Sequence, residues 1–209
     1  SAGKDMARVG IARTQSFVTC EKLGIIGHYT WDKDACIFPE RIDGRIAYVH
    51  RVDPSIQIDY FDSFEELLDL KTWEGYERRV EASTVLRAAY PWECGKVGGS
   101  LPPLRTDRGW LFIYHAVELF PDRPFIYRAG AALLDLDNPS RVIARLPYPI
   151  LEPREEYELK GDVNNVVFPV GGYLHNGDLY ISYGAADRCV ALAKIPLNEL
   201  ISELEKHPA

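Results

Sequence analysis

Four basic side chains stand at matched places along the sequence: Lys33, Arg51, Lys96 and His115. Proteins hold phosphate by bringing several cationic and hydrogen-bond donor groups onto one anion, so this set predicts a phosphate site. Each member lies near the start or the end of an expected β-strand, where distant parts of a chain meet. Any one of them alone is better explained as a surface cation. Their matched spacing favours a shared site.

Asp187 and several aromatic rings are candidates for sugar binding. Asp187 follows an expected strand and a run of small residues, where its carboxylate would reach a sugar hydroxyl; a role in a turn explains it equally well. The rings that would stack on the apolar face of a pyranose, or else pack in the core, are Tyr29, Trp31, Trp110 and Tyr127. Trp110 lies inside a continuous apolar run, which favours the core.

The sequence repeats itself. Pro39, Pro103 and Pro169 are 64 and 66 residues apart, and each precedes a turn and an aromatic β-like run. The glycines that mark these turns as hairpins are Gly44, Gly109 and Gly177. A period this regular indicates copies of one supersecondary unit.

A unit of this length with several short strands is typical of a β-propeller blade with long loops. The chain has room for about three blades and a partial one, and it opens on what matches the third strand of a blade. The prediction is therefore an all-β, incomplete propeller in a single domain, residues 1–209. A β-sandwich is the competing fold, but it does not explain the spacing of the repeats.

Other elements follow from local patterns. Ser63 stands three residues before Glu66, the spacing of a capping box, which predicts a short helix. Apolar residues at helical spacing predict a short C-terminal helix from Leu197. The charged stretch 74–81 is interpreted as a solvated face. Further strands are expected at 8–12, 55–60, 128–132 and 189–193.

The composition excludes several classes of protein. With 46% hydrophobic residues in 209, the chain can bury a substantial core, and its net charge of −7 argues against general binding to nucleic acid. No apolar stretch approaches membrane-spanning length and no secretory segment is visible, so the cytoplasm is the expected location. The four cysteines are widely spaced, which favours free thiols over a disulfide set or a metal site.

At these residues the sequence resembles glycoside hydrolase family 130, the inverting β-mannoside phosphorylases. The resemblance covers nearly the whole chain, and its most specific part runs from Tyr127 to Leu151. The other matching stretches are 33–40, 50–51, 96–103, 109–115, 165–169 and 183–187. The resemblance implies a five-bladed propeller with the active site on its axis. It implies a phosphate set of Lys33, Arg51, Lys96 and His115. It also implies a substrate-binding set of Asp34, Tyr127, Arg128 and Asp187.

The implied reaction is phosphorolysis of a β-mannoside to α-mannose 1-phosphate, with inorganic phosphate as co-substrate and no further cofactor. The family carries its general acid in a Glu-Asp-Pro-Arg motif that precedes the strand matching Arg8 to Ala12, and this sequence has no such motif. Val52-Asp53-Pro54-Ser55 lies after the Arg51 position and is not equivalent. No catalytic residue is assigned here, and the acid is expected on a segment upstream of Ser1.

Two other functions stay open from the sequence. One is a β-mannoside hydrolase of the same family, although such members are expected to lack the basic set kept here. The other is a truncated propeller that binds a sugar or a protein without catalysis. The expected partners are a β-mannoside oligosaccharide and phosphate. Open edge strands in an incomplete ring also predict association with further copies of the chain.

Overall fold

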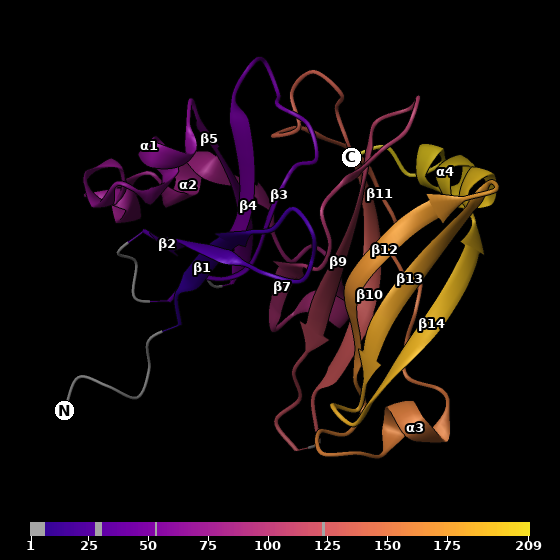
Figure 1. Cartoon of the computed structure of the whole chain (residues 1–209). Helices are drawn as coiled ribbons and strands as arrows, with labels where there is room; N and C mark the ends of the chain where they lie inside the picture. The colour runs from indigo at the N-terminus through magenta and orange to yellow at the C-terminus, as the bar shows by residue number, and fades with distance from the viewer. Residues whose placement is uncertain (1–6, 28–30, 53, 123) are drawn as a thin grey trace.

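The computed structural model describes residues 7–27, 31–52, 54–122 and 124–209, which form four antiparallel sheets (Figure 1). The first is a two-stranded hairpin of β1 (Val9–Arg13) and β2 (Glu21–Ile26). The other three follow one another along the chain, each made of strands close in sequence. This is the predicted arrangement of three blades and a partial one.

The second sheet has the order β3-β4-β5-β6. Its strands are β3 (Lys33–Ile37), β4 (Ile46–Val52), β5 (Ser55–Phe61) and β6 (Thr84–Leu86). A helical insertion connects β5 to β6 and lies on the side of β4 and β5 away from the later sheets (Figure 1). It consists of α1 (Phe64–Leu68), the 3-10 turns η1 (Leu70–Trp73) and η2 (Tyr76–Arg78), and α2 (Val80–Ser83).

The helical insertion begins as the sequence predicts. Ser63 is the N-cap of α1, and its hydroxyl accepts a hydrogen bond from the Glu66 backbone N–H at 3.1 Å. The Glu66 carboxylate accepts a hydrogen bond from the Asp62 N–H and not from the Ser63 N–H, so the predicted capping box is incomplete. The interpretation of 74–81 as a solvated face is wrong at Tyr76, which is fully buried.

The third sheet has the order β11-β10-β9-β7, with β8 also paired to β9. Its strands are β7 (Lys96–Gly99), β8 (Leu104–Arg105), β9 (Trp110–Glu118), β10 (Ile126–Leu134) and β11 (Val142–Arg145), and the 3-10 turn η3 (Pro91–Glu93) precedes them. Strand β9 is buried along all but its last residue, as its continuous apolar run predicts. Gly130 on β10 leaves room for Tyr114, because a Cβ there would lie 2.3 Å from the Tyr114 ring.

The fourth sheet is a three-stranded meander followed by the predicted C-terminal helix. Its strands are β12 (Val167–His175), β13 (Asp178–Ala185) and β14 (Cys189–Pro196), preceded by the short α3 (Glu156–Leu159). Helix α4 (Leu197–Glu205) packs at one end of this sheet through Leu200, Ile201 and Leu204 (Figure 1).

The core lies between neighbouring sheets. Val49 and Ile56 of the second sheet pack with Phe112 of β9, whereas the next residues of β9, Leu111 and Ile113, pack with the fourth sheet. Successive side chains of a strand point to opposite faces, so β9 joins two apolar layers. The three larger sheets therefore stack face to face like blades of a propeller.

Among the described residues, none of the helices combines the length and apolar character needed to cross a lipid bilayer. The four cysteines are free thiols. The expected cytoplasmic location stays a prediction.

Candidate functional site

Arg51 and His115 meet at one buried point, although they come from different sheets. Arg51 lies near the end of β4, His115 lies near the end of β9, and both side chains are 1% exposed. Arg51 Nη1 is 3.4 Å from His115 Nε2. Both groups face the carboxylate of Asp34, whose Oδ2 is 2.6 Å from Arg51 Nη1 and 3.3 Å from His115 Nε2. We call Asp34, Arg51 and His115 the anion cluster.

The two lysines of the predicted set occupy equivalent places beside this cluster. Lys33 is the first residue of β3 and pairs across the sheet with Arg51. Lys96 is the first residue of β7, and its cross-strand partner is Val117, two residues beyond His115 on the same face of β9. Lys33 and Lys96 are half-buried. The repeat seen in the sequence therefore brings all four basic residues to one region.

Asp34 reaches Arg51 because β3 is irregular at this position. The pairing of β3 with β4 shifts between Lys33 and Cys36, and Asp34 adopts a left-handed backbone conformation with φ of 51°. Such a bulge re-aims a side chain that a regular pleat would direct elsewhere. Neither contact to Asp34 Oδ2 has hydrogen-bond geometry, so charge holds this buried oxygen.

Gly98 makes the close approach of Asp34 and His115 possible. It pairs with His115 across β7 and β9. A Cβ at Gly98 would lie 2.4 Å from Asp34 Oδ2 and 2.6 Å from His115 Nε2. Any larger side chain would therefore displace these two groups, and glycine is needed here for space and not for a special φ.

Ser100 and Phe168 complete the surroundings of His115. Ser100 Oγ is 3.1 Å from His115 Nδ1, and the Phe168 ring lies 4.3 Å from the imidazole between centroids. A cavity of about 150 Å³ opens beside Asp34 and is lined further by Ser100, Phe168 and Val170. These two roles are not predicted from the sequence, although Ser100 follows the glycine pair Gly98-Gly99 and Phe168 precedes the repeat proline Pro169.

The electrostatics of the cluster suit an anion. Burial by itself would raise the pKa of Asp34, but the close approach of His115 and the charges of Arg51 and Lys33 outweigh it and lower that pKa. Burial lowers the pKa of His115, the charges of Arg51 and Lys96 act in the same direction, and Asp34 opposes them. At neutral pH the region thus holds three cations, one carboxylate and a neutral imidazole with one N–H donor.

Tyr127 lies next to the cluster, and the turn that holds Asp187 is linked to Tyr127 through the backbone. The Tyr127 ring is 6.1 Å from that of His115 and 6.0 Å from that of Phe168. The Tyr127 N–H donates to the carbonyl of Asn165, and the Ala186 N–H donates to that of Val166, so Tyr127 and the turn holding Asp187 share one backbone ladder. Asp187 is exposed, with a left-handed φ of 52°, and it makes no ion pair within the described part of the chain.

Arg128 lies on the opposite face of β10 from Tyr127, because successive side chains alternate. Its guanidinium contacts Glu118 at 2.5 Å and Glu152 at 3.4 Å. The predicted substrate-binding set is thus only partly brought together. Asp34 and Tyr127 lie beside His115, whereas Asp187 is exposed on its turn and Arg128 is held by two carboxylates.

The other aromatic candidates divide between core and surface. Trp110 is fully buried in the core, as its apolar run favours. Trp31 is 37% exposed, and Lys33 Nζ lies 5.7 Å above its ring. Tyr29 lies outside the described residues.

The stacked sheets and the cationic cluster between them define a propeller-like protein with a buried polar site shared by two blades. The family model described as beta-1,4-mannooligosaccharide phosphorylase matches residues 2–206, and the chain belongs to this family, glycoside hydrolase family 130.

Individual relatives agree with this assignment. The chain is 36% identical to the 1,2-beta-oligomannan phosphorylase of Thermoanaerobacter sp. (strain X514), over 94% of this chain and 61% of the relative. It is 33% identical to the Beta-1,4-mannooligosaccharide phosphorylase of Ruminococcus albus, over 95% of this chain and 58% of the relative. The chain thus spans about three fifths of the length of these relatives.

A solved structure supports the fold. The chain superposes on the Beta-1,2-Mannobiose phosphorylase from Listeria innocua, in its complex with beta-1,2-mannobiose, with a TM-score of 0.79 at 30% identity. The match covers 95% of this chain and 53% of that one. The predicted all-β propeller class is confirmed, with three blades and a partial one in this chain.

Proposed function

We propose that this chain carries the phosphate-binding part of an enzyme that cleaves β-mannosides by phosphorolysis and releases α-mannose 1-phosphate. The observation that carries the proposal is the convergence of Arg51 and His115 on one buried point, with Lys33 and Lys96 at equivalent strand ends beside them. Both curated relatives above are named as phosphorylases of mannan or mannooligosaccharides, which supports the same chemistry.

In the proposed site, phosphate takes the place that water has in an inverting glycosidase. One phosphate oxygen attacks the anomeric carbon of the mannosyl unit as the bond from that carbon to the leaving oxygen breaks. A carboxylic acid donates its proton to the leaving oxygen. Phosphate already carries negative charge, so the chain must position it and need not supply a general base. Arg51, Lys33 and Lys96 offer charge, and neutral His115 offers one directed N–H.

The sugar contacts are assigned to the side chains around this phosphate. Asp34 and Asp187 would accept hydrogen bonds from hydroxyls, and the Tyr127 ring would face the pyranose. Arg128 stays a predicted substrate-binding residue. Together with its carboxylate partners, Glu118 and Glu152, it would form hydrogen bonds with a larger oligosaccharide. The acid is assigned to no residue of this sequence, which lacks the Glu-Asp-Pro-Arg motif.

Phosphate binding by the chain itself tests the proposal. We expect calorimetric titration with inorganic phosphate to show one site, weakened at least tenfold by Arg51→Lys, because lysine loses the forked donor geometry. His115→Asn should weaken it as well. Arg105→Lys is the matched control, because Arg105 is an exposed arginine paired with Glu40 and should bind phosphate normally. A chain that folds but takes up no phosphate would refute the assignment.

The hydrolase of the same family is separated by turnover. In a longer form of this polypeptide that carries the acid, we expect β-mannobiose to be consumed only when phosphate is present, with α-mannose 1-phosphate visible by ³¹P NMR. Release of free mannose at the same rate without phosphate would establish the hydrolase instead.

A further inference from the structure

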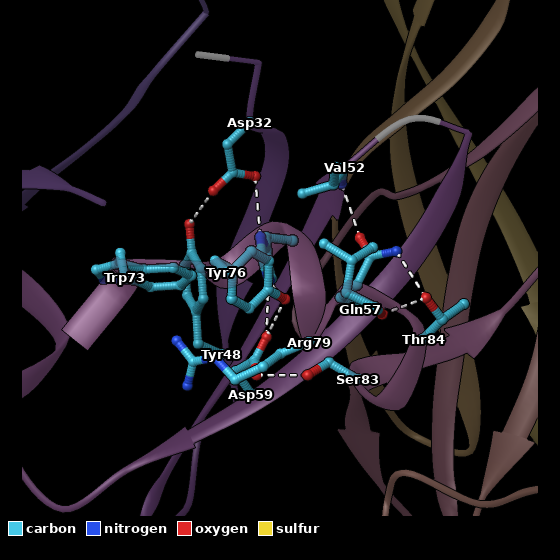
Figure 2. Close-up of polar contacts among 12 residues, drawn as sticks. Asp32, Tyr48, Val52, Gln57, Asp59, Trp73, Tyr76, Arg79, Ser83 and Thr84 are labelled. Atoms are coloured by element: carbon cyan, nitrogen blue, oxygen red, sulfur yellow. Dashed lines mark hydrogen bonds and ion pairs between the residues drawn. The ribbon is translucent and has the colours of Figure 1, made fainter. Parts of the chain in front are cut away.

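A second polar cluster lies on the face of β4 that points away from the anion cluster. His50, the neighbour of Arg51, is fully buried there. Its Nδ1 is 3.1 Å from Asp32 Oδ1, and its Nε2 is 3.0 Å from Asp59 Oδ2. The Tyr76 hydroxyl, also 3.0 Å from Nε2, donates to Asp59. Figure 2 shows Asp32 at one end of this cluster and Asp59 at the other.

The environment of His50 selects its protonated form. A neutral imidazole has one donor nitrogen and one acceptor nitrogen, whereas the imidazolium donates from both. Both nitrogens of His50 face a carboxylate, so only the imidazolium satisfies the two contacts. Burial opposes the charge, but hydrogen bonds and charges of Asp32 and Asp59 prevail and raise the pKa of His50 to about 9. The charge is thus enclosed between two acids.

Aromatic side chains fix the ring in this place. Tyr48 stacks on the imidazole with centroids 4.8 Å apart, and Trp73 meets it edge-on at 5.6 Å. The Tyr48 hydroxyl also donates to Asp32 at 3.4 Å, and Ser83 donates to Asp59 at 2.6 Å (Figure 2). Asp32 directly precedes β3, Asp59 lies on β5, and Tyr76 and Ser83 lie in the helical insertion, so the cluster ties these three segments to β4.

The contact between His50 and Asp32 lies next to the residues that determine the geometry of the anion cluster. Asp32 directly precedes Lys33 and Asp34, the residues at which the β3 ladder shifts and the backbone turns left-handed. On β4, His50 directly precedes Arg51, whose guanidinium faces Asp34 on the other side of the strand. One contact therefore clamps the two strands at the positions that set the distance between Asp34 and Arg51.

We propose that His50, held as an imidazolium between Asp32 and Asp59, is a positioning residue for phosphate binding: it fixes the β3 bulge so that Lys33, Asp34 and Arg51 keep their arrangement. The inference rests on the proposed function, because phosphate is the ligand whose affinity reports the arrangement. It gives the helical insertion a role, since Asp59 is held by Tyr76 and Ser83 from that segment.

Two substitutions test the proposal. His50→Asn removes the charge and one of the two contacts, and we expect phosphate affinity to fall about tenfold. Asp32→Asn keeps the shape and an acceptor for Nδ1 but removes one charge, so a smaller loss of a few-fold is expected. Both variants are compared with wild type by calorimetry with inorganic phosphate, after circular dichroism has confirmed folding.

Glu93→Gln is the matched control. Glu93 is fully buried and pairs with Arg145 and Tyr114, and Tyr114 precedes His115 as His50 precedes Arg51. This control disturbs an equally buried ion pair beside the other half of the cluster but leaves Asp32 in place. Phosphate affinity within about threefold of wild type is expected, whereas an equal loss in the control would show general destabilisation and overturn the proposal.

A spectroscopic readout separates positioning from mere stability. In ¹⁵N-histidine NMR spectra at pH 7.5, both ring nitrogens of His50 should be protonated, and the His115 resonances should shift in Asp32→Asn although Asp32 does not contact His115. Wild-type phosphate affinity in both variants, or a neutral His50, would overturn the proposal. Absence of phosphate binding in wild type, with a protonated His50, would instead count against the proposed function.

Discussion

The two buried histidines of the site region have opposite protonation for reasons that can be named. His50 faces two carboxylates, so its pKa is raised although it is fully buried. His115 faces one carboxylate and two cations, so burial prevails and its pKa is lowered. One histidine is therefore a fixed positive charge inside the protein, and the other is a neutral donor available to a ligand. The charged neighbours of each histidine therefore decide its protonation state and its role.

Stability should depend on pH through His50. Its folded pKa of about 9 is above its ordinary value of 6.5, so the charged ring favours the folded state; this contribution is complete below pH 6.5 and is lost as the pH rises through about 9. The shift corresponds to stabilisation on the order of 3 kcal/mol. We expect urea denaturation of wild type and His50→Asn to show a difference in unfolding free energy that shrinks between pH 6.5 and 9.5.

Among the residues that the structure describes, the ionisable groups in contact with His50 are Asp32, Asp59, Tyr48 and Tyr76. Burial is the largest cause that raises the pKa of both tyrosines, so they stay neutral over this range. A difference between the two proteins that is independent of pH from 6.5 to 9.5 would contradict a charged His50.

At the scale of elements, strand β7 packs directly against the side chains of the anion cluster. It is short and contains two adjacent glycines, Gly98 and Gly99, which let the side chains of β3 and β9 meet above it. Gly130 on β10 has a different neighbour, because a Cβ there would strike the buried ring of Tyr114. The first close approach serves the site, and the second serves the core.

Gly98→Ala should therefore damage binding more than folding. The atoms in its way are the ends of the Asp34 and His115 side chains, which can turn aside while the backbone stays. We expect phosphate affinity to fall at least tenfold, with about 1 kcal/mol lost in unfolding free energy. Calorimetry and urea denaturation measure the two quantities.

Alanine substitutions at two other glycines serve as comparisons for Gly98→Ala. Gly10→Ala on β1 should change neither quantity, since the nearest atom to its Cβ is 3.8 Å away. Gly130→Ala should lower stability clearly, because the Tyr114 ring is packed in the core. Normal phosphate affinity in a folded Gly98→Ala protein would show that the anion cluster is not the phosphate site.

At the scale of the whole molecule, the sheets stack in series, and the last one has exposed apolar side chains on its outer face. Two apolar layers join the second sheet to the third and the third to the fourth. On the far face of the fourth sheet, Val190 and Leu192 are 77% and 60% exposed, beside the stacked rings of Tyr173 and Tyr180. Exposed apolar groups on adjacent strands favour association.

In a solution of this chain alone, we expect that face to associate with a second copy of the chain. We expect sedimentation velocity to show association that increases with protein concentration. Lysine at both positions, Val190→Lys with Leu192→Lys, should weaken association about tenfold or more, because two charges would have to be buried. The changes lie on the face away from the core, so urea denaturation should be unaffected.

The outcome that contradicts this prediction is a wild-type chain that sediments as a monomer at all concentrations. A control with lysine in place of Leu70, which is also exposed but lies in the helical insertion, should leave association unchanged.

The sequence by itself determined the repeat and the elements that carry it. Proline and glycine punctuation, aromatic runs and apolar periodicity are local signals, and they predicted the strands, the short helix after Ser63 and the C-terminal helix. The repeat also placed Lys33 with Lys96 and Arg51 with His115 at equivalent strand ends, as the structure has them.

Only the tertiary structure decided which groups meet. The bulge that turns Asp34 onto Arg51 and the burial of Tyr76 against His50 both depend on strand register and on how separate elements pack. A shift of one residue in register moves every side chain to the other face, so the register is set only when the apolar face of a strand packs against its neighbours. The sequence therefore determined which residues stand at the strand ends, and packing between sheets decided their partners and their charges.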